Sequence, residues 1–179
     1  PEPSPSPEPT PSPSPKPSPS PEPTPSPKPS PSPSPKPTSK PSLSVGKTFT
    51  SGKAAYQVTK AGAAVELTKL KSTSAAVTIN TVKGKDGVEY KVTSIGPNAM
   101  KGNKKLKSLR IGNNVRHIDA YAFSGCTNLS TVTFGKNVTT IRLGAFKGCT
   151  GLRTPITLPD SVEGIGISAF AGCTNIPAI

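Results

Sequence analysis

Residues 115–126 read Val-Arg-His-Ile-Asp-Ala-Tyr-Ala-Phe-Ser-Gly-Cys, and residues 138–149 read Val-Thr-Thr-Ile-Arg-Leu-Gly-Ala-Phe-Lys-Gly-Cys. Both follow the pattern V-x-x-I-x-x-x-A-F-x-G-C. The pattern recurs, with small changes, one period earlier and one period later, so its isoleucine occurs as Ile95, Ile118, Ile141 and Ile165. The period is 23, 23 and then 24 residues. Self-similarity at a fixed period of about 20–50 residues predicts a solenoid or another array of repeats.

The second half of each unit predicts one short strand. Its apolar residues are spaced as Leu106-x-x-Leu109-x-Ile111, Leu129-x-x-Val132-x-Phe134 and Leu152-x-x-x-Ile156-x-Leu158. Alternation at the end of each run places one face in a core and the other in solvent. The extra residue of the last run, near Pro155, accounts for the 24-residue step. The Ala-Phe-x-Gly-Cys half is too short and too rich in Gly for a long helix, so we expect one helical turn or a tight bend there.

An asparagine follows two of these runs, at Asn114 and Asn137. Leucine-rich repeats place Asn or Cys at this position after L-x-x-L-x-L. One unit cannot bury its own apolar side chains, so neighbouring units must stack on one another. We therefore predict a leucine-rich-repeat solenoid. Met100 and Asn103 stand in the first unit where later units have Phe and Cys, which suits a unit close to the end of the stack.

The full pattern I-x-x-x-A-F-x-G-C-x-x-L-x-x-V-x-F, together with Leu158-Pro-Asp-Ser-Val162, resembles the BspA-like, or Treponema-type, leucine-rich repeats of bacterial surface proteins. The resemblance covers about half of the chain. Members of that family are often extracellular, modular and implicated in adhesion to proteins or cells, so it implies a surface-exposed binding module. The chain opens on Pro1 and stops at Ile179 within a repeat, and we expect a fragment whose export signal lies upstream.

Residues 1–42 form a separate, proline-rich segment. Proline occupies every odd position from Pro1 to Pro37, and then Pro41. Strict X-Pro alternation removes backbone donors and favours an extended polyproline-II-like chain. We expect a semi-rigid spacer, similar to those of bacterial wall-associated proteins, and it serves either as a stalk or as a plain interdomain linker. A PxxP ligand is disfavoured because no Arg or aromatic residue interrupts the run.

Residues 43–90 predict an N-terminal β cap, and residues 91–179 hold about four repeats, the last one truncated. Tyr56-Gln-Val58 and Val65-Glu-Leu67 alternate around Gly62, which predicts a β-hairpin, although the Ala content leaves a helix as an alternative. Residues 76–80 resemble the strand half of a repeat, and residues 83–87 predict a turn before the first complete unit. Solenoids need such a cap to shield the open edge of the stack.

The outward side chains of the predicted strands form the candidate binding site. Thr78, Arg110, Thr133 and Thr157 fall in one row, and Ser108 and Thr131 in the next. Solenoids commonly bind partners on such a concave strand face, although threonine there also suits any exposed strand. We expect a monomer that binds a protein or glycan. The alternatives are a structural spacer and an accessory domain of a larger secreted enzyme.

The formal net charge is +13, from 22 basic and nine acidic residues. The segment 1–42 holds four of the basic and three of the acidic residues, so the excess belongs to residues 43–179. A basic cluster falls on the first full unit, at Lys101, Lys104, Lys105, Lys107, Arg110 and Arg116. It is either a solvated face or a patch for anionic polymers. Nucleic acid is disfavoured because no aromatic residue interleaves the lysines; the absence of Trp also weakens a sugar-stacking lectin. No apolar run approaches the roughly 18 residues of a membrane span.

An enzyme is the weakest hypothesis, and we predict no catalytic residue, cofactor or metal. His117 and Asp119 could belong to a hydrolase with a serine, but they occupy variable positions, equivalent to Thr140 and Arg142 in the next unit. Surface decoration is therefore the better interpretation. The three cysteines lie a full repeat apart, whereas metal ligands need short spacings such as C-x-x-C. We expect buried free thiols at Cys126, Cys149 and Cys173, with parallel rather than facing side chains.

Overall fold

The computed structural model describes residues 43–179; the predicted spacer of residues 1–42 lies outside the described residues. The described part contains eleven strands. They are β1 (Thr48–Ser51), β2 (Ala54–Lys60), β3 (Ala64–Leu70), β4 (Ala76–Ile79), β5 (Thr81–Lys83), β6 (Glu89–Ile95), β7 (Ser108–Ile111), β8 (His117–Ile118), β9 (Thr131–Thr133), β10 (Thr140–Ile141) and β11 (Gly164–Ile165).

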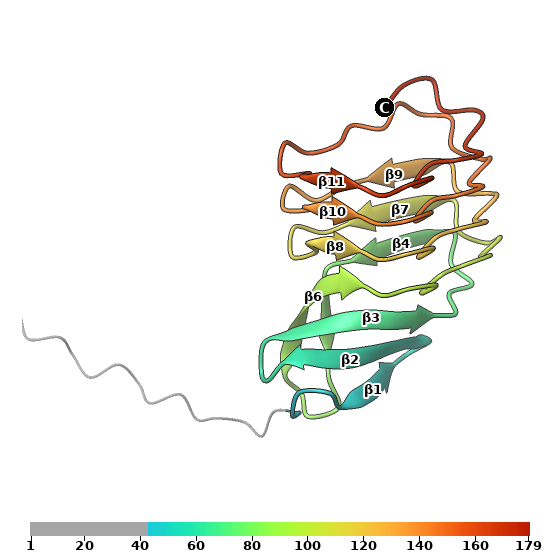
Figure 1. Ribbon diagram of the computed structural model, residues 1–179. Helices are drawn as coiled ribbons and strands as arrows, with labels where there is room; N and C mark the ends of the chain where they lie inside the picture. Colours follow the sequence, from blue (N-terminus) through green and yellow to red (C-terminus); the bar gives the residue numbers. More distant parts are fainter. Residues whose placement is uncertain (1–42) are drawn as a thin grey trace, which may run out of the picture. The chain divides into compact units, whose positions relative to one another are not determined.

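The strands form two sheets, and successive coils of the chain contribute a strand to each of them (Figure 1). The larger sheet has the order β1-β2-β3-β6-β8-β10-β11, with β5 paired to β6, and the smaller has the order β4-β7-β9. From β6 onward every step between successive coils is a parallel pairing. Each coil of the chain crosses from one sheet to the other, so the molecule is a β-solenoid of roughly four turns, as the repeats predict.

The repeats contain two short strands each, so the prediction of one strand per repeat is wrong in this detail. The Val-x-x-Ile segments form the second ladder, in which Ile95 pairs with Ile118, Ile118 with Ile141, and Ile141 with Ile165. Only two residues of each segment pair, which is too short a run for the alternation of a strand to show in the sequence. The ladder places the Ile95, Ile118 and Ile141 side chains in the core, whereas Ile165, on the last strand, is 50% exposed.

The Ala-Phe segments are tight bends, and no helix occurs within residues 43–179. The residue two positions before each Phe or Met has a positive φ: 55° at Asn98, 58° at Tyr121, 57° at Gly144 and 59° at Ser168. The glycine two positions after each Phe or Met also has a positive φ, for example 73° at Gly125. Left-handed residues four apart end a right-handed turn before a helix can propagate. Of the two predicted conformations, the bend is therefore the one observed.

The core lies between the two sheets and is built from the same repeat positions in successive coils. The fully buried side chains include Ile95, Ile118 and Ile141 from the larger sheet and Leu109 from the smaller one. Phenylalanines at the bends stack in a column, with 5.1 Å between the ring centroids of Phe123 and Phe146 and 5.3 Å between those of Phe146 and Phe170. A fourth ring, at Phe134, meets Phe146 edge-on, with 5.8 Å between the ring centroids.

Residues 43–90 continue both sheets toward the N-terminus. The predicted hairpin is confirmed: β2 and β3 pair antiparallel with Val58 opposite Val65, so the helix alternative is wrong. β3 then pairs in parallel with β6, and β4 pairs in parallel with β7. The Tyr90 hydroxyl donates to Asp86 Oδ2 at 2.7 Å, and the N–H of Leu43 donates to the same oxygen at 3.2 Å. The assignment of this segment as a cap stays a prediction.

The run Leu152–Leu158 is not a strand, contrary to the prediction from its apolar spacing. Proline at position 155 has no N–H to donate to the neighbouring strand, and proline is therefore excluded from the middle of a ladder. The N–H of Ile156 instead donates to the carbonyl of Ala178 at 3.0 Å. The smaller sheet consequently ends at β9, and Ile156 still fills the core as a buried residue.

Candidate functional site

The outward side of the β4-β7-β9 sheet, here called the three-strand face, brings five of the six predicted binding residues together. The register pairs Thr78 with Arg110 and Arg110 with Thr133, so these three form one row across the sheet. Ser108 pairs with Thr131 in the neighbouring row. Four of these side chains are exposed and Thr131 is half-buried, because the residues between them, such as Leu109 and Val132, take the core side of each strand.

Thr157 does not join the row as a strand residue. It lies in the segment in which Pro155 prevents pairing, beyond the last strand of the face. It is exposed, and it lines the same depression as Thr131 and Thr133. The structure therefore keeps Thr157 beside the predicted surface, although the register that predicted it is wrong.

Two depressions hollow the three-strand face, and together they are called the groove below. The first has a volume of about 330 Å³ and is lined by Thr78, Asn80, Arg110 and the segment 111–114, with Thr133, Phe134 and Gly135. The second has a volume of about 740 Å³ and extends from Thr131 to Pro159. They share Asn113, Thr133 and Phe134 as lining residues. The groove thus runs continuously from β4 past β9.

Asparagines fix the walls of the groove where the strands end. Asn114 Nδ2 donates to Asn80 Oδ1 at 2.9 Å, which ties two successive coils together. Asn113 Oδ1 accepts from the N–H of Lys136 at 3.0 Å, and Asn137 Nδ2 donates to the Asn113 carbonyl at 2.9 Å. The Asn113 amide oxygen is therefore engaged, whereas its Nδ2 has no hydrogen-bond partner in the described part of the chain. Asn113 Nδ2 therefore lines the groove as a hydrogen-bond donor whose position is fixed by the bond to Asn113 Oδ1.

The groove is electropositive. Arg110 lies in the first depression and Lys136 in the second, and the described residues that line the two include no Asp or Glu. The ion pair found within residues 43–179 joins Asp119 to Arg142, which lie next to strands of the other sheet. Arg110 is therefore a guanidinium with no carboxylate partner among the described residues, in a hollow that a ligand can enter.

The predicted basic cluster does not form one patch. Lys101, Lys104, Lys105 and Lys107 all precede β7, whereas Arg116 lies in the loop that leads into β8 of the other sheet. The length of β7, about 10 Å at the rise of a strand, separates the two groups. Lys101 places its Nζ over the Tyr121 ring, 5.5 Å from the centroid. Of the cluster, only Arg110 lines the groove.

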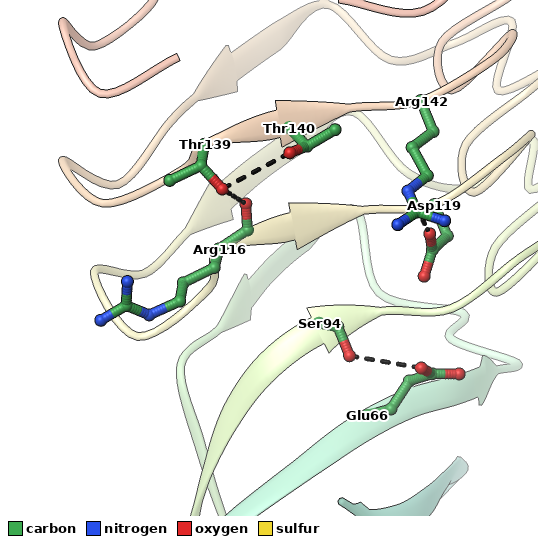
Figure 2. Close-up of polar contacts among 7 residues, drawn as sticks. All are labelled: Glu66, Ser94, Arg116, Asp119, Thr139, Thr140 and Arg142. Carbon is green, nitrogen blue, oxygen red and sulfur yellow. Dashed lines mark hydrogen bonds and ion pairs between the residues drawn. The ribbon is translucent and has the colours of Figure 1, made fainter. Parts of the chain in front are cut away.

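His117 and Asp119 lie on the larger sheet and do not form a relay with a serine. Asp119 Oδ1 pairs with Arg142 Nε at 3.1 Å, and their side chains are 18% and 59% exposed (Figure 2). The only serine beside His117 in the ladder is Ser94, which donates to Glu66 Oε2 at 3.3 Å instead. A hydrolase needs the carboxylate on the histidine and the histidine on the serine. Nδ1 of His117 is buried without a hydrogen-bond partner in the described part of the chain.

The cysteines are free thiols stacked one repeat apart. Each Sγ donates to a carbonyl of the preceding coil: Cys126 to Met100 at 3.3 Å, Cys149 to Phe123 at 3.2 Å and Cys173 to Phe146 at 3.1 Å. Cys126 and Cys149 are buried, as predicted, and Cys173 is half-buried. Within residues 43–179 no three His, Cys, Asp or Glu side chains come close enough to hold a metal ion.

The groove residues that the sequence reasoning missed include Asn80, Asn113, Phe134 and Lys136. Phe134 ends an apolar run and counts as core from its spacing, yet it remains half-buried and lines both depressions. The equivalent positions Asn113 and Lys136 follow a Gly at the end of each run, and this repetition was the available signal.

A further surface feature lies outside the groove. Leu143, Ile165 and Ile167 are 41%, 50% and 81% exposed, and an apolar depression of about 420 Å³ lies between β10, β11 and Ala120. Ile165 is exposed, unlike its buried equivalents, because β11 has a strand on one side only. Nothing in the structure shows what covers this surface.

A β-solenoid with the run L-x-x-L-x-I in its coils is the architecture of a leucine-rich-repeat protein. The family model described as "BspA type Leucine rich repeat region" matches residues 69–179 in six copies. The chain therefore belongs to the BspA-type leucine-rich-repeat family. The matched range starts within the segment 43–90 and includes the β4 strand.

Solved structures support the same assignment. A leucine-rich repeat protein from Bacteroides ovatus shares 33% identity with a TM-score of 0.62, over 69% of this chain and 33% of that chain. One from Bacteroides capillosus shares 29% identity with a TM-score of 0.58, over 66% of this chain and 86% of that chain. The Treponema pallidum leucine-rich-repeat protein shares the fold at 24% identity and a TM-score of 0.52, over 63% and 61% of the two chains. The chain thus spans 33% of the length of the B. ovatus protein.

A comparison with curated proteins finds no match. Among residues 43–179 there is no helix with the length and apolar character needed to cross a membrane.

Proposed function

We propose that this chain is a surface-exposed, extracellular module that binds a protein or glycan through the three-strand face. The observation that carries the proposal is the row of Thr78, Arg110 and Thr133, which the ladder aligns on one exposed surface over a groove. The family supports it, because BspA-type repeats generally occur in surface proteins that interact with other proteins. The proposed module is a monomer without a catalytic site. The predicted role of the proline-rich segment 1–42, either a stalk or a plain interdomain linker, lies outside the described residues.

The rigidity of the face favours a binding role. Each strand of the face is held by the next coil, and the Asn80–Asn114 and Asn113–Asn137 bonds fix the loops beside it. A ligand therefore meets side chains whose backbone is already ordered, and it does not have to bear the free-energy cost of ordering a loop. A domain that only spaces other domains needs the stack and has no need of a polar groove.

The test is binding of the full chain to an array of matrix proteins and glycans, at physiological salt of about 0.15 M and at about 1 M, where exposed charges are largely screened. We expect at least one ligand whose binding survives high salt. The double variant Arg110→Ala/Thr133→Ala should lose it, whereas the matched control Arg116→Ala/Thr140→Ala, on the other side of the same coils, should retain it. Binding at low salt only would reduce the module to a cationic surface, and no binding at either salt would favour the spacer.

A further inference from the structure

The groove combines three kinds of surface that one class of ligand requires together. Arg110 and Lys136 supply positive charge, and the Thr78 and Thr133 hydroxyls and the Asn113 amide supply hydrogen-bond donors and acceptors. Phe134 supplies an aromatic surface at the junction of the two depressions. A sugar acid presents the matching groups: a carboxylate, several hydroxyls and an apolar C–H face of the ring.

The Phe134 ring is held in place for such a contact. It packs edge-on against the buried Phe146 ring, at 76° between the ring planes and 5.8 Å between centroids. It is nevertheless only half-buried and lines the groove. An aromatic ring fixed by a core residue offers contact area with little loss of conformational entropy on binding. The chain has no Trp, but stacking on a sugar needs only an accessible aromatic ring, and Phe134 supplies one.

The spacing of the face also fits a chain of sugars. Adjacent strands lie about 4.7–4.9 Å apart, so Thr78 and Thr133, two strands apart, are about 10 Å from each other. One sugar residue of an extended oligosaccharide spans a similar length to one strand spacing. Two successive sugar residues would therefore place their substituents over successive strands, with Arg110 in the middle of the row.

We propose that the groove binds an acidic oligosaccharide, with one sugar carboxylate on Arg110 and an adjacent sugar ring against Phe134. The inference rests on the proposed function, because it names the ligand class of the same face. An acidic peptide such as poly-glutamate fits less well, because it carries no hydroxyls for the neutral polar groups of the groove and no ring face for Phe134. The hydroxyls and the sugar ring separate the two ligands.

The experiment measures binding of the full chain to fluorescently labelled oligogalacturonate, oligomannuronate and hyaluronan fragments by anisotropy, at about 0.15 M salt. Methyl-esterified oligogalacturonate is the neutral control with the same backbone, and poly-glutamate is the acidic peptide control. We expect at least one uronate oligomer to bind more tightly than both controls. If no uronate oligomer binds, or if poly-glutamate binds as tightly, the inference is overturned.

Two groove variants and one control variant assign the binding to the groove. Arg110→Gln should weaken it about 10- to 100-fold, the range expected for a lost hydrogen bond to a charged group. Arg116→Gln removes the same charge outside the groove and should change it by less than about twofold, because screening weakens a distant exposed charge. Phe134→Leu keeps an apolar side chain but removes the ring, and it should weaken binding of the uronate oligomer while leaving poly-glutamate binding unchanged. Equal losses in the two arginine variants would overturn the groove as the site.

The outcomes separate this inference from the proposed function. If the uronate oligomers fail to bind but an array ligand is still lost in Arg110→Ala/Thr133→Ala, the ligand class is wrong and the face remains the binding surface. If the array ligand binds that variant as tightly as the wild type, the proposed function itself fails, and the sugar-acid inference fails with it.

Discussion

The phenylalanine column makes Phe146 the side chain whose loss should damage the solenoid most. Its side chain is fully buried. Its ring contacts Phe123 in the preceding coil, Phe134 directly after β9 and Phe170 in the following coil. Replacement of a buried Phe by Ala costs about 3–5 kcal/mol. Three aromatic contacts, each worth about 0.5–1.5 kcal/mol beyond burial, place Phe146→Ala at the upper end of that range.

Phe170→Ala is the matched control. Phe170 is the same residue type at the same repeat position, but it is half-buried and has one ring contact among the described residues, with Phe146. Its truncation removes about half of the buried area and should cost about 1–2 kcal/mol, by scaling the cost of truncating a fully buried Phe.

The assay is urea unfolding of the full chain, followed by circular dichroism. With a slope of about 2 kcal/mol/M, a loss of about 4 kcal/mol lowers the midpoint by about 2 M. A folded domain has about 5–15 kcal/mol in total, so Phe146→Ala should leave a marginal fold at most. Equal midpoints for the two variants, or a shift under about 0.5 M for Phe146→Ala, would refute the stacked-core account.

Three further predictions concern the bend, the N-terminal segment and the thiols. Gly144→Ala should destabilise the fold by about 1–2 kcal/mol in urea unfolding, because residue 144 has a positive φ and the added Cβ would lie 2.6 Å from the Tyr121 ring. The hydrogen bond from the Tyr90 hydroxyl lowers the pKa of Asp86 below its ordinary 3.8. The stability that this carboxylate provides is therefore fully present above pH 3.8 and is lost as the pH falls through the folded-state pKa. Asp86→Asn should flatten this part of the curve of stability against pH. Cys173 is half-buried whereas Cys126 and Cys149 are buried, so a thiol reagent should label Cys173 before the other two cysteines in the folded chain.

Each of these has a control. Gly164→Ala meets no atom within 4 Å and has no positive φ, so it should be nearly neutral; an equal cost at both glycines would remove the bend argument. Glu89→Gln, an exposed carboxylate close to Asp86 in sequence, should keep the wild-type acid dependence. Labelling of all three thiols at one rate in the folded protein would contradict the buried positions of Cys126 and Cys149.

The repeat pattern was enough to predict the solenoid and most of its buried positions, because equivalent residues of successive coils pack in the same place in the core. The same isoleucine and phenylalanine positions are therefore buried in successive coils up to Ile141 and Phe146, whereas in the last coil Ile165 is exposed and Phe170 half-buried. The second ladder escaped prediction because a two-residue strand leaves no alternation to detect. Thr157 left the predicted row because a single proline outweighs an apolar spacing that otherwise indicates a strand.

The sequence was enough to predict which residues share a strand face, but it was not enough to predict on which side of the coil the other residues lie. Register arguments placed Thr78, Arg110 and Thr133 in one row because strand alternation is local. The cluster of lysines looked contiguous because its members are close in sequence, but one coil turns through both sheets within 23 residues and carries them to different sides. The exposure of Phe134 depends on the hollow left by neighbouring coils, which no pattern within one repeat describes.

The central claim, that the three-strand face is the binding surface, is tested most directly by amide hydrogen exchange on the complex of the full chain with its tightest high-salt ligand from the array. The account predicts protection in three segments that are distant in sequence, residues 76–80, 108–114 and 131–136, with no change at residues 117–119 and 140–143 on the other sheet. Protection of the latter pair, with the three-strand face unchanged, would contradict the claim.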